Sequence, residues 1–163
     1  MNNITLHFAK FIYKVCWFIL NLLFSVLFPV KTNRLLFESE SDFSDNGRAL
    51  YEYMIREGYN KRYEIIWLVA DPQKYSEYNT YNVKFVKKKL FRGNCRTLRS
   101  LYYACTSKFI FFTHTMSWIL IRKKNQKFVN LWHGCGYKAS KGNSDKIKFD
   151  YCLVPVKVFK NQE

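Results

Sequence analysis

A strand-like segment changes abruptly into a polar loop within residues 128–142, FVNLWHGCGYKASKG. Its first residues are mostly apolar, and His133, Gly134, Gly136 and Lys138 follow at once. An imidazole, with an unperturbed pKa of about 6.5, can accept a proton from a hydroxyl group at neutral pH. Glycines let backbone N–H groups turn toward an anion, and a lysine adds a positive charge. The loop therefore combines a candidate general base with groups that can bind an anion.

Short apolar segments alternate with helix-like segments in the rest of the chain. The patterns predict strands at 34–39, 63–70, 108–114 and 127–133, weaker strand candidates at 82–86 and 151–156, and helices at 45–58 and 94–107. Leu98, Leu101, Tyr102 and Cys105 are expected to lie on one face of the second helix. Strands that are apolar on both faces and alternate with helices predict a Rossmann-like α/β domain with a mostly parallel sheet.

The predicted strand ends carry polar side chains. In an open α/β sheet, ligands bind just beyond the carboxyl ends of the strands. Ser39, Ser41 and Asp42 lie at or after the first of these ends, and His114 and His133 lie at two later ones. Ser39, Ser41, Asp42 and His114 are therefore candidates for contact with a substrate or its phosphate groups. For His114 the alternative is a polar side chain whose hydrogen bonds are satisfied within the protein.

An apolar run covers residues 15–30, and Asn21 and Ser25 are its only polar members. As a helix it would be about 24 Å long, less than the roughly 30 Å of a hydrocarbon core. Basic residues flank it on both sides, so no crossing direction is specified. We therefore expect residues 1–31 to form a helix that lies on or partly in the cytoplasmic face of the plasma membrane; burial against protein is the alternative. The residues predicted to contact lipid or headgroups are Lys10, Lys14, Trp17, Phe18, Phe24 and Lys31.

Charge and cysteine content narrow the function classes. Lysine and arginine number 27 against 12 acidic residues, a net charge of +15, which favours nucleic acid, an anionic membrane or a phosphate-rich substrate as partner. The five cysteines include no C-x-x-C pair, which argues against a disulfide framework or a zinc knuckle and fits a reducing cytosol. No cluster of metal ligands is visible in the sequence.

The Trp-His-Gly motif and the residues around it resemble the signature of a known family. NLWHG followed by Lys138, four residues after Gly134, resembles the WHGTPxK signature of the CDP-glycerol glycerophosphotransferases, which build teichoic-acid-type polymers. The segments FESESDFSDNGRALYEYM, YEIIWLV and LRSLYYACTSKFIFFTH also resemble the N-terminal domain of that family, so the likeness covers roughly residues 33–160. One departure is that Cys135 and Gly136 stand where the family has Thr-Pro.

The resemblance implies a fold, a reaction and roles for residues. It implies that residues 32–163 form the N-terminal, acceptor-side half of a GT-B fold, and that the C-terminal, donor-binding half is absent. The reaction implied is transfer of glycerol phosphate or ribitol phosphate from a CDP-activated donor to a teichoic-acid-like or capsular polymer. His133 would be the general base, with Gly134, Gly136 and Lys138 near phosphate. No cofactor is implied, except Mg²⁺ held through substrate phosphates, and little activity is expected from the chain alone.

Two other functions fit the same residues. One is a non-catalytic, membrane-attached module whose basic face holds an anionic polymer. The other is a nucleic-acid-binding domain, because residues 84–93, KFVKKKLFRG, interleave basic and aromatic side chains. The transferase interpretation expects no nucleic acid as partner.

Overall fold

The computed structural model describes residues 3–90, 96–114, 116, 118–119, 121–131 and 149–153, and for residues 3–10 it describes the backbone alone. In chain order the elements are α1 (Asn3–Leu27), β1 (Lys31–Glu38), α2 (Asp45–Arg56), η1 (Tyr59–Lys61), β2 (Glu64–Val69), η2 (Pro72–Tyr78), β3 (Val83–Lys87), α3 (Leu98–Thr106), β4 (Ser107–Phe112), β5 (Lys127–Asn130) and β6 (Tyr151–Cys152). Each strand and helix predicted after residue 31 corresponds to one of these elements. The predicted α/β fold is therefore confirmed, with boundaries that move by a few residues.

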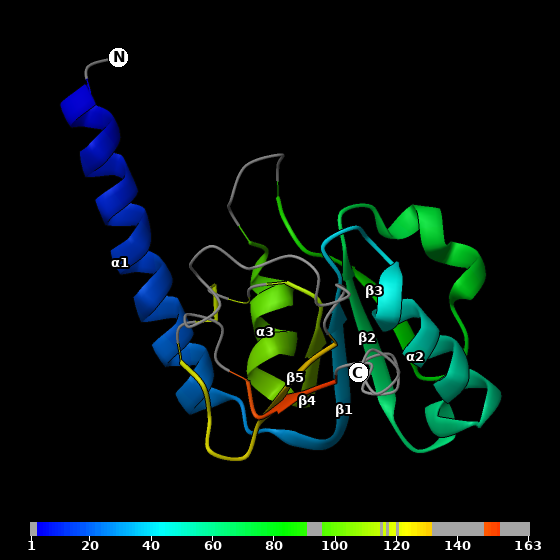
Figure 1. Ribbon diagram of the computed structural model, residues 1–163. Coiled ribbons are helices and arrows are strands. Elements are labelled where there is room, and N and C mark those ends of the chain that lie inside the picture. Colours follow the sequence, from blue (N-terminus) through cyan, green and yellow to red (C-terminus); the bar gives the residue numbers. More distant parts are fainter. Residues whose placement is uncertain are drawn as a thin grey trace, which may run out of the picture.

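The six strands form one sheet in the order β3-β2-β1-β4-β5-β6, and every neighbouring pair is parallel. This is the strand order of a Rossmann fold, in which the chain starts in the middle, builds toward one edge and then returns to build toward the other. The reversal falls between β1 and β4, where Glu38 pairs with Phe112 at the carboxyl ends of the two strands. Figure 1 shows these central strands between helices on both faces of the sheet.

Alternate residues of the strands build two separate cores. Leu36, Ile66 and Ile110 face α3, whereas Leu35, Ile65 and Trp67 face α2 and the 3₁₀ turns. All six side chains are 2% exposed or less, so both faces of these central strands are covered. The near-continuous apolar runs that predicted a doubly covered sheet reflect this burial.

Phe43 holds the loop between β1 and α2 against the sheet. Its ring lies 5.1 Å from that of Trp67 and 4.7 Å from that of Tyr78, centroid to centroid. Its backbone has a φ of +48°, a left-handed conformation that is uncommon for a residue other than glycine. Aromatic packing from several elements therefore fixes an unfavourable backbone conformation next to the carboxyl edge of the sheet.

The two central helices follow the sequence pattern. α2 buries Tyr51 and Met54, and Gly58, just beyond its end, has the left-handed φ of +71° expected of a C-terminal glycine. α3 buries Leu101 and Cys105. On the same face of the helix, Tyr102 is partly buried and Leu98 is exposed. It is the first residue of α3, which begins at the end of the sheet, where nothing in the described part of the chain covers it.

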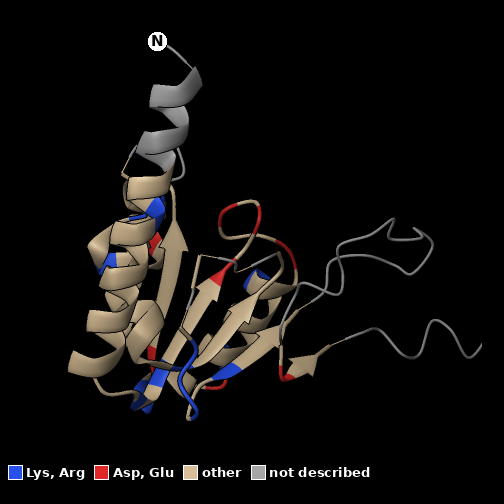
Figure 2. Cartoon of the chain, turned by 90° about the vertical axis from the view of Figure 1, so that its left-hand side faces the viewer, with Lys and Arg blue, Asp and Glu red and all other residues tan. Residues whose placement is uncertain are grey.

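Helix α1 packs on the outer side of α3. Trp17 is only 8% exposed, contacts Leu101 and Cys105, and its indole Nε1 donates to the carbonyl of Trp118 at 3.0 Å. The N-terminal part of α1 extends beyond the rest of the domain (Figure 1). Figure 2 shows mostly uncharged residues along the coloured part of the helix, and the sequence of α1 contains two lysines and no acidic residue. Among the described residues, no helix is both long and apolar enough to cross a bilayer.

Candidate functional site at the carboxyl edge of the sheet

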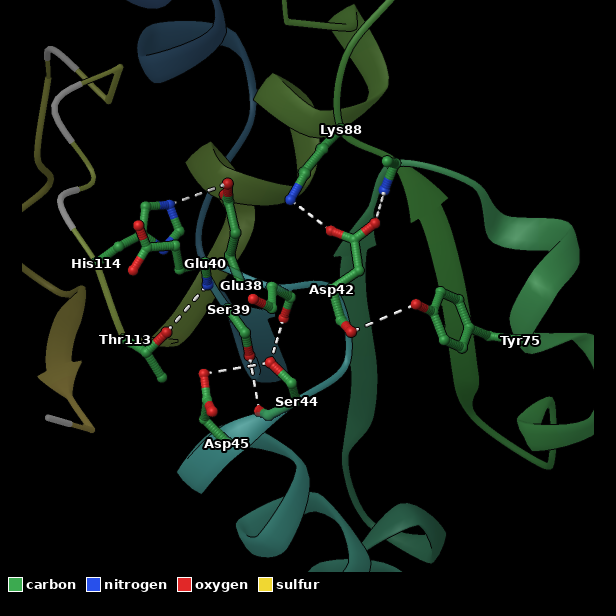
Figure 3. A network of polar contacts seen from close by, with 12 residues as sticks. Glu38, Ser39, Glu40, Asp42, Ser44, Asp45, Tyr75, Lys88, Thr113 and His114 are labelled. Carbon is green, nitrogen blue, oxygen red and sulfur yellow. Dashed lines mark hydrogen bonds and ion pairs between the residues drawn. The ribbon is translucent and has the colours of Figure 1, made fainter. Parts of the chain in front are cut away.

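The polar side chains gather where the strand order reverses. Glu38 ends β1, and Thr113 and His114 follow β4 directly. The Thr113 N–H donates to the Glu38 carbonyl at 3.3 Å, and the Glu40 N–H donates to Thr113 Oγ1 at 3.1 Å. These bonds join the ends of β1 and β4, as Figure 3 shows for the Glu40–Thr113 pair. A switch point of this kind is where open α/β sheets bind ligands.

A buried carboxylate lies at the centre of this edge. One oxygen of Glu38, Oε1, lies 2.7 Å from Arg96 Nη2 and 3.4 Å from His114 Nε2. The side chains of Glu38 and Arg96 are 1% and 8% exposed, and the guanidinium of Arg96 lies 4.2 Å from the centroid of the Trp118 ring. Glu38 therefore holds a cation and an imidazole in fixed positions at the switch point.

The Glu38 carboxyl is ionised at neutral pH. Burial raises its pKa, but the hydrogen bond from His114 and the positive charge of Arg96 outweigh burial and hold the pKa below its usual 4.5. A buried carboxylate of this kind is retained only because its partners compensate for the loss of water. The arrangement provides a negative charge that orients the imidazole, as a carboxylate does in many catalytic sites.

The loop between β1 and α2 packs tightly onto the same edge. Ser39 is buried, and its Oγ donates to the carbonyl of Ser44 at 3.1 Å (Figure 3). A Cβ atom at Gly47 would lie 2.9 Å from Ser39 Oγ and 3.1 Å from Trp67 Cη2. Only glycine lets the first turn of α2 come so close to the end of β1, a contact that Rossmann folds also make through a glycine. Ser41 is exposed, and its carbonyl accepts from the Ser44 hydroxyl.

Asp42 ties this loop to the next two strands. Its carboxylate accepts from the Ala70 N–H after β2 and pairs with Lys88 after β3, as Figure 3 shows. Its carbonyl accepts from the Tyr75 hydroxyl at 3.3 Å. These contacts give Asp42 a structural role at the edge; the contact with substrate phosphate expected from the sequence stays a prediction. Lys88 belongs to the basic segment 84–93, in which Lys84 is also paired, with Glu64 at 2.8 Å.

The segment that carries the predicted base begins at this edge. Leu131 donates its N–H to the Phe112 carbonyl at 2.8 Å, and its own carbonyl accepts from Asn46 Nδ2 at 3.0 Å. The first turn of α2 and the end of β4 therefore fix Leu131, two residues before His133. The predicted residues His133, Gly134, Gly136 and Lys138 themselves lie outside the described residues, and their roles stay predictions.

Of the residues predicted to contact a membrane, some are exposed and others are buried. Lys14, Phe18 and Lys31 are exposed. Trp17 was expected to reach headgroups, but its ring fills the space between α1 and α3 and faces inward. Phe24 is partly buried in the same cluster, with its ring 5.1 Å from that of Phe28. The side chain of Lys10 is outside the described part of the helix.

Sequence reasoning missed Glu38, Arg96 and Trp118. The expected strand ended at Ser39, and the predicted site residues lie at or after that end, whereas Glu38 lies within the strand. The available signal was a carboxylate within the apolar run RLLFES, since a charge on the buried face of a strand requires a partner. The partner could not be named, because Arg96 is distant in sequence. In the described part of the chain, no group of three or more His, Cys, Asp or Glu residues is placed to hold a metal ion.

A parallel sheet with this strand order and a polar switch point defines a Rossmann-type α/β domain. The chain matches the family model described as CDP-glycerol:poly(glycerophosphate) glycerophosphotransferase over residues 20–148, most of its length. It therefore belongs to that family, as the Trp-His-Gly motif predicted.

Individual relatives agree with this assignment. A teichoic acid poly(glycerol phosphate) polymerase from Bacillus spizizenii is 25% identical over 123 residues, which cover 74% of this chain and 29% of the relative. Solved structures of the wall teichoic acid polymerase TagF share the fold. One matches with a TM-score of 0.56 at 22% identity and covers 80% of this chain and 31% of TagF. Another matches with a TM-score of 0.55 at 23% identity. The chain thus spans less than a third of the length of these relatives.

Proposed function

We propose that this chain is the acceptor-side domain of an enzyme that transfers polyol phosphate, as glycerol phosphate or ribitol phosphate, from a CDP-activated donor to a teichoic-acid-like or capsular polymer. The observation that carries the proposal is family membership combined with a polar switch point in a Rossmann sheet. The edge offers a carboxylate, an imidazole and serines, and Leu131 fixes the start of the segment that contains His133. A growing polymer that ends in a hydroxyl group is the substrate that suits these groups.

The proposed reaction is a displacement at phosphorus. The terminal hydroxyl oxygen of the acceptor attacks the donor phosphorus that carries the polyol, and the bond from that phosphorus to the oxygen of CMP breaks. His133 takes the hydroxyl proton as general base, a contribution of about 10²–10⁴-fold. Lys138 and the backbone at Gly134 and Gly136 stabilise charge on the phosphoryl oxygens. Any Mg²⁺ would bind through the substrate phosphates.

Binding of the donor nucleotide requires a second domain. Because the chain spans less than a third of its relatives, we expect a second, donor-binding domain to complete the active site. The isolated chain is then expected to bind acceptor but to transfer little or nothing. A non-catalytic module that only holds an anionic polymer would behave in the same way alone, so activity must be tested with the second domain supplied.

Helix α1 supports a place at the cytoplasmic membrane surface. Its outward side exposes a row of large apolar residues: Phe11, Ile12, Tyr13, Val15, Phe18, Ile19, Leu22, Leu23, Val26 and Leu27. Lys14 and Lys31 are exposed on or next to the helix, and the chain carries a net charge of +15. An anionic bilayer fits an apolar stripe with basic neighbours, because lipid tails cover the stripe and headgroups attract the lysines.

Reconstitution tests the proposed reaction. The full chain is mixed with the donor-binding domain of a family member, CDP-glycerol and a short poly(glycerol phosphate) acceptor, and both CMP release and acceptor lengthening are measured. We expect lengthening with one CMP released per unit added, and a loss of about 100-fold or more in His133→Ala. Polymer binding without any lengthening would favour the non-catalytic module, and an unchanged rate in His133→Ala would remove the proposed base.

A further inference from the structure

Four side chains of one connected cluster each carry a buried polar atom without a hydrogen-bond partner. The atoms are Glu38 Oε2, Arg96 Nη1, His114 Nδ1 and Trp118 Nε1. Glu38 contacts both Arg96 and His114 through its other oxygen, and Arg96 lies over the ring of Trp118. A fifth such atom, Asn130 Oδ1, belongs to the end of the next strand, β5. Unpartnered buried polar atoms are therefore concentrated at the switch point within the described part of the chain.

A fold gains nothing from leaving such atoms unpaired. Each buried donor or acceptor without a partner costs about 1–3 kcal/mol, and native proteins contain only a few per hundred residues. Here the atoms come from three separate segments: the end of β1, the residues before α3 and the residues after β4. A concentration of this kind is expected where a ligand completes the hydrogen bonds.

The four atoms specify the chemistry of that ligand. Arg96 Nη1 and Trp118 Nε1 are donors, and Glu38 Oε2 is an acceptor. When His114 Nε2–H donates to Glu38, Nδ1 of a neutral His114 is a second acceptor. A phosphodiester group offers only acceptors and would meet the negative charge of Glu38. A hydroxyl group both donates and accepts, so two neighbouring hydroxyl groups match two donors and two acceptors.

We propose that the cluster Glu38–Arg96–His114–Trp118 is a polyol subsite, which binds the hydroxyl groups at the free end of the acceptor polymer. The inference rests on the proposed function for the identity of the polyol. Glu38 accepts from the polyol through Oε2 and holds Arg96 and His114 in place through Oε1. Trp118 is in turn held by Trp17 of α1, whose indole donates to the Trp118 carbonyl.

A titration followed by the indole N–H signals of the full chain tests the subsite. The chain has four tryptophans, so each signal can be assigned by substitution. The probes are glycerol 3-phosphate, which carries two alcohol hydroxyl groups, and inorganic phosphate, which carries the same kind of charge without the polyol. We expect glycerol 3-phosphate to shift the Trp118 signal in a saturable way and inorganic phosphate to leave it in place. The Trp67 indole N–H, also unpartnered but on the α2 side of the sheet, is the internal reference and should not move.

Two variants sharpen the result. Trp118→Phe removes one donor and keeps a ring beneath Arg96, and we expect binding of glycerol 3-phosphate, followed through the His114 ring signals, to weaken about five- to tenfold. Glu64→Gln changes an ion pair with Arg34 at the opposite edge of the sheet and should leave the affinity unchanged. An immobile Trp118 signal, an equal shift with inorganic phosphate, or unchanged affinity in Trp118→Phe would each overturn the subsite. If reconstituted transfer succeeds while this titration fails, the proposed function stands and the polyol subsite alone is rejected.

Discussion

Replacing Glu38 by glutamine removes one negative charge from the centre of the carboxyl edge and changes little else. The amide has nearly the shape of the carboxyl group, so no cavity is created. Its oxygen can still accept from Arg96 or His114, but the guanidinium of Arg96, 8% exposed, loses its counter-charge. The variant therefore isolates the electrostatic part of the cluster.

The expected loss of stability follows from burial. Removing one partner of a buried ion pair costs about 3–5 kcal/mol, because the other charge is left buried and unpaired. We expect the lower end, about 3 kcal/mol, because the amide oxygen keeps a hydrogen bond. For a domain of this size that loss lowers the melting temperature by roughly 6–12 °C. It is a large part of the 5–15 kcal/mol that typically separates folded from unfolded chains.

Urea unfolding followed by tryptophan fluorescence measures the effect. Two matched variants provide a comparison for the loss of stability in Glu38→Gln. Glu64→Gln is expected to lose less, because the Glu64 side chain is 16% exposed against 1% for Glu38 and because Arg34 also donates to Thr106 Oγ1. Glu52→Gln, in the exposed pair with Arg48, is expected to change nothing measurable. A midpoint for Glu38→Gln equal to that of Glu52→Gln would refute the view that Glu38 holds a buried cation at the switch point.

Three further outcomes are expected. Gly47→Ala should lower the free energy of unfolding by about 1–2 kcal/mol in urea unfolding, because the new Cβ meets Ser39 Oγ at 2.9 Å and the buried Trp67 ring at 3.1 Å, and unchanged stability would show that the first turn of α2 has room. Because the pKa of Glu38 is lowered by folding, its contribution to stability is present above pH 4.5 and is lost as the pH falls below that value through the folded pKa; a urea midpoint that falls equally steeply with pH in Glu38→Gln would contradict this. Val26→Glu, on the outward side of α1, should reduce sedimentation with anionic vesicles several-fold. The control is Tyr81→Glu, because Tyr81 is 69% exposed and Val26 74%, and it should leave sedimentation unchanged. Equal losses in the two variants would argue against attachment through α1.

The fold could be predicted because its signals are local. Runs such as YEIIWLVA are apolar on both faces, and only strands covered on both sides of a sheet have that composition. The order of the strands was beyond sequence reasoning, since it depends on pairings between distant segments. β1, for example, pairs with β4, more than 70 residues later. The reversal between β1 and β4, which locates the site, is set by those long-range pairings.

The orientation of α1 shows a second limit. The apolar run has only two polar members, Asn21 and Ser25, and Trp17 was predicted to contact lipid or headgroups. Its actual direction depends on α3, where Leu101 and Cys105 leave space for an indole. A single helix does not reveal in its sequence which of its apolar sides faces protein.

Some residues at the carboxyl edge were predicted from the sequence, but the buried ion pair at its centre was not. Ser39 and His114 were predicted from their place at strand ends, and both lie at the carboxyl edge. Glu38 and Arg96 were missed because their role depends on the ion pair that they form, and sequence alone does not show that they meet. A carboxylate in an apolar strand and an arginine before a helix gain significance only when the fold brings them to 2.7 Å.

The central claim is that the acceptor polymer binds at the carboxyl edge between β1 and β4. Backbone amide NMR of the full chain, titrated with a short poly(glycerol phosphate), tests it most directly. The account predicts saturable shifts at Glu38–Ser44, Thr113, His114 and Asn130, with Arg34 and Glu64 at the opposite edge unmoved. Shifts confined to the Arg34–Glu64 edge, or spread evenly over the exposed lysines, would contradict it.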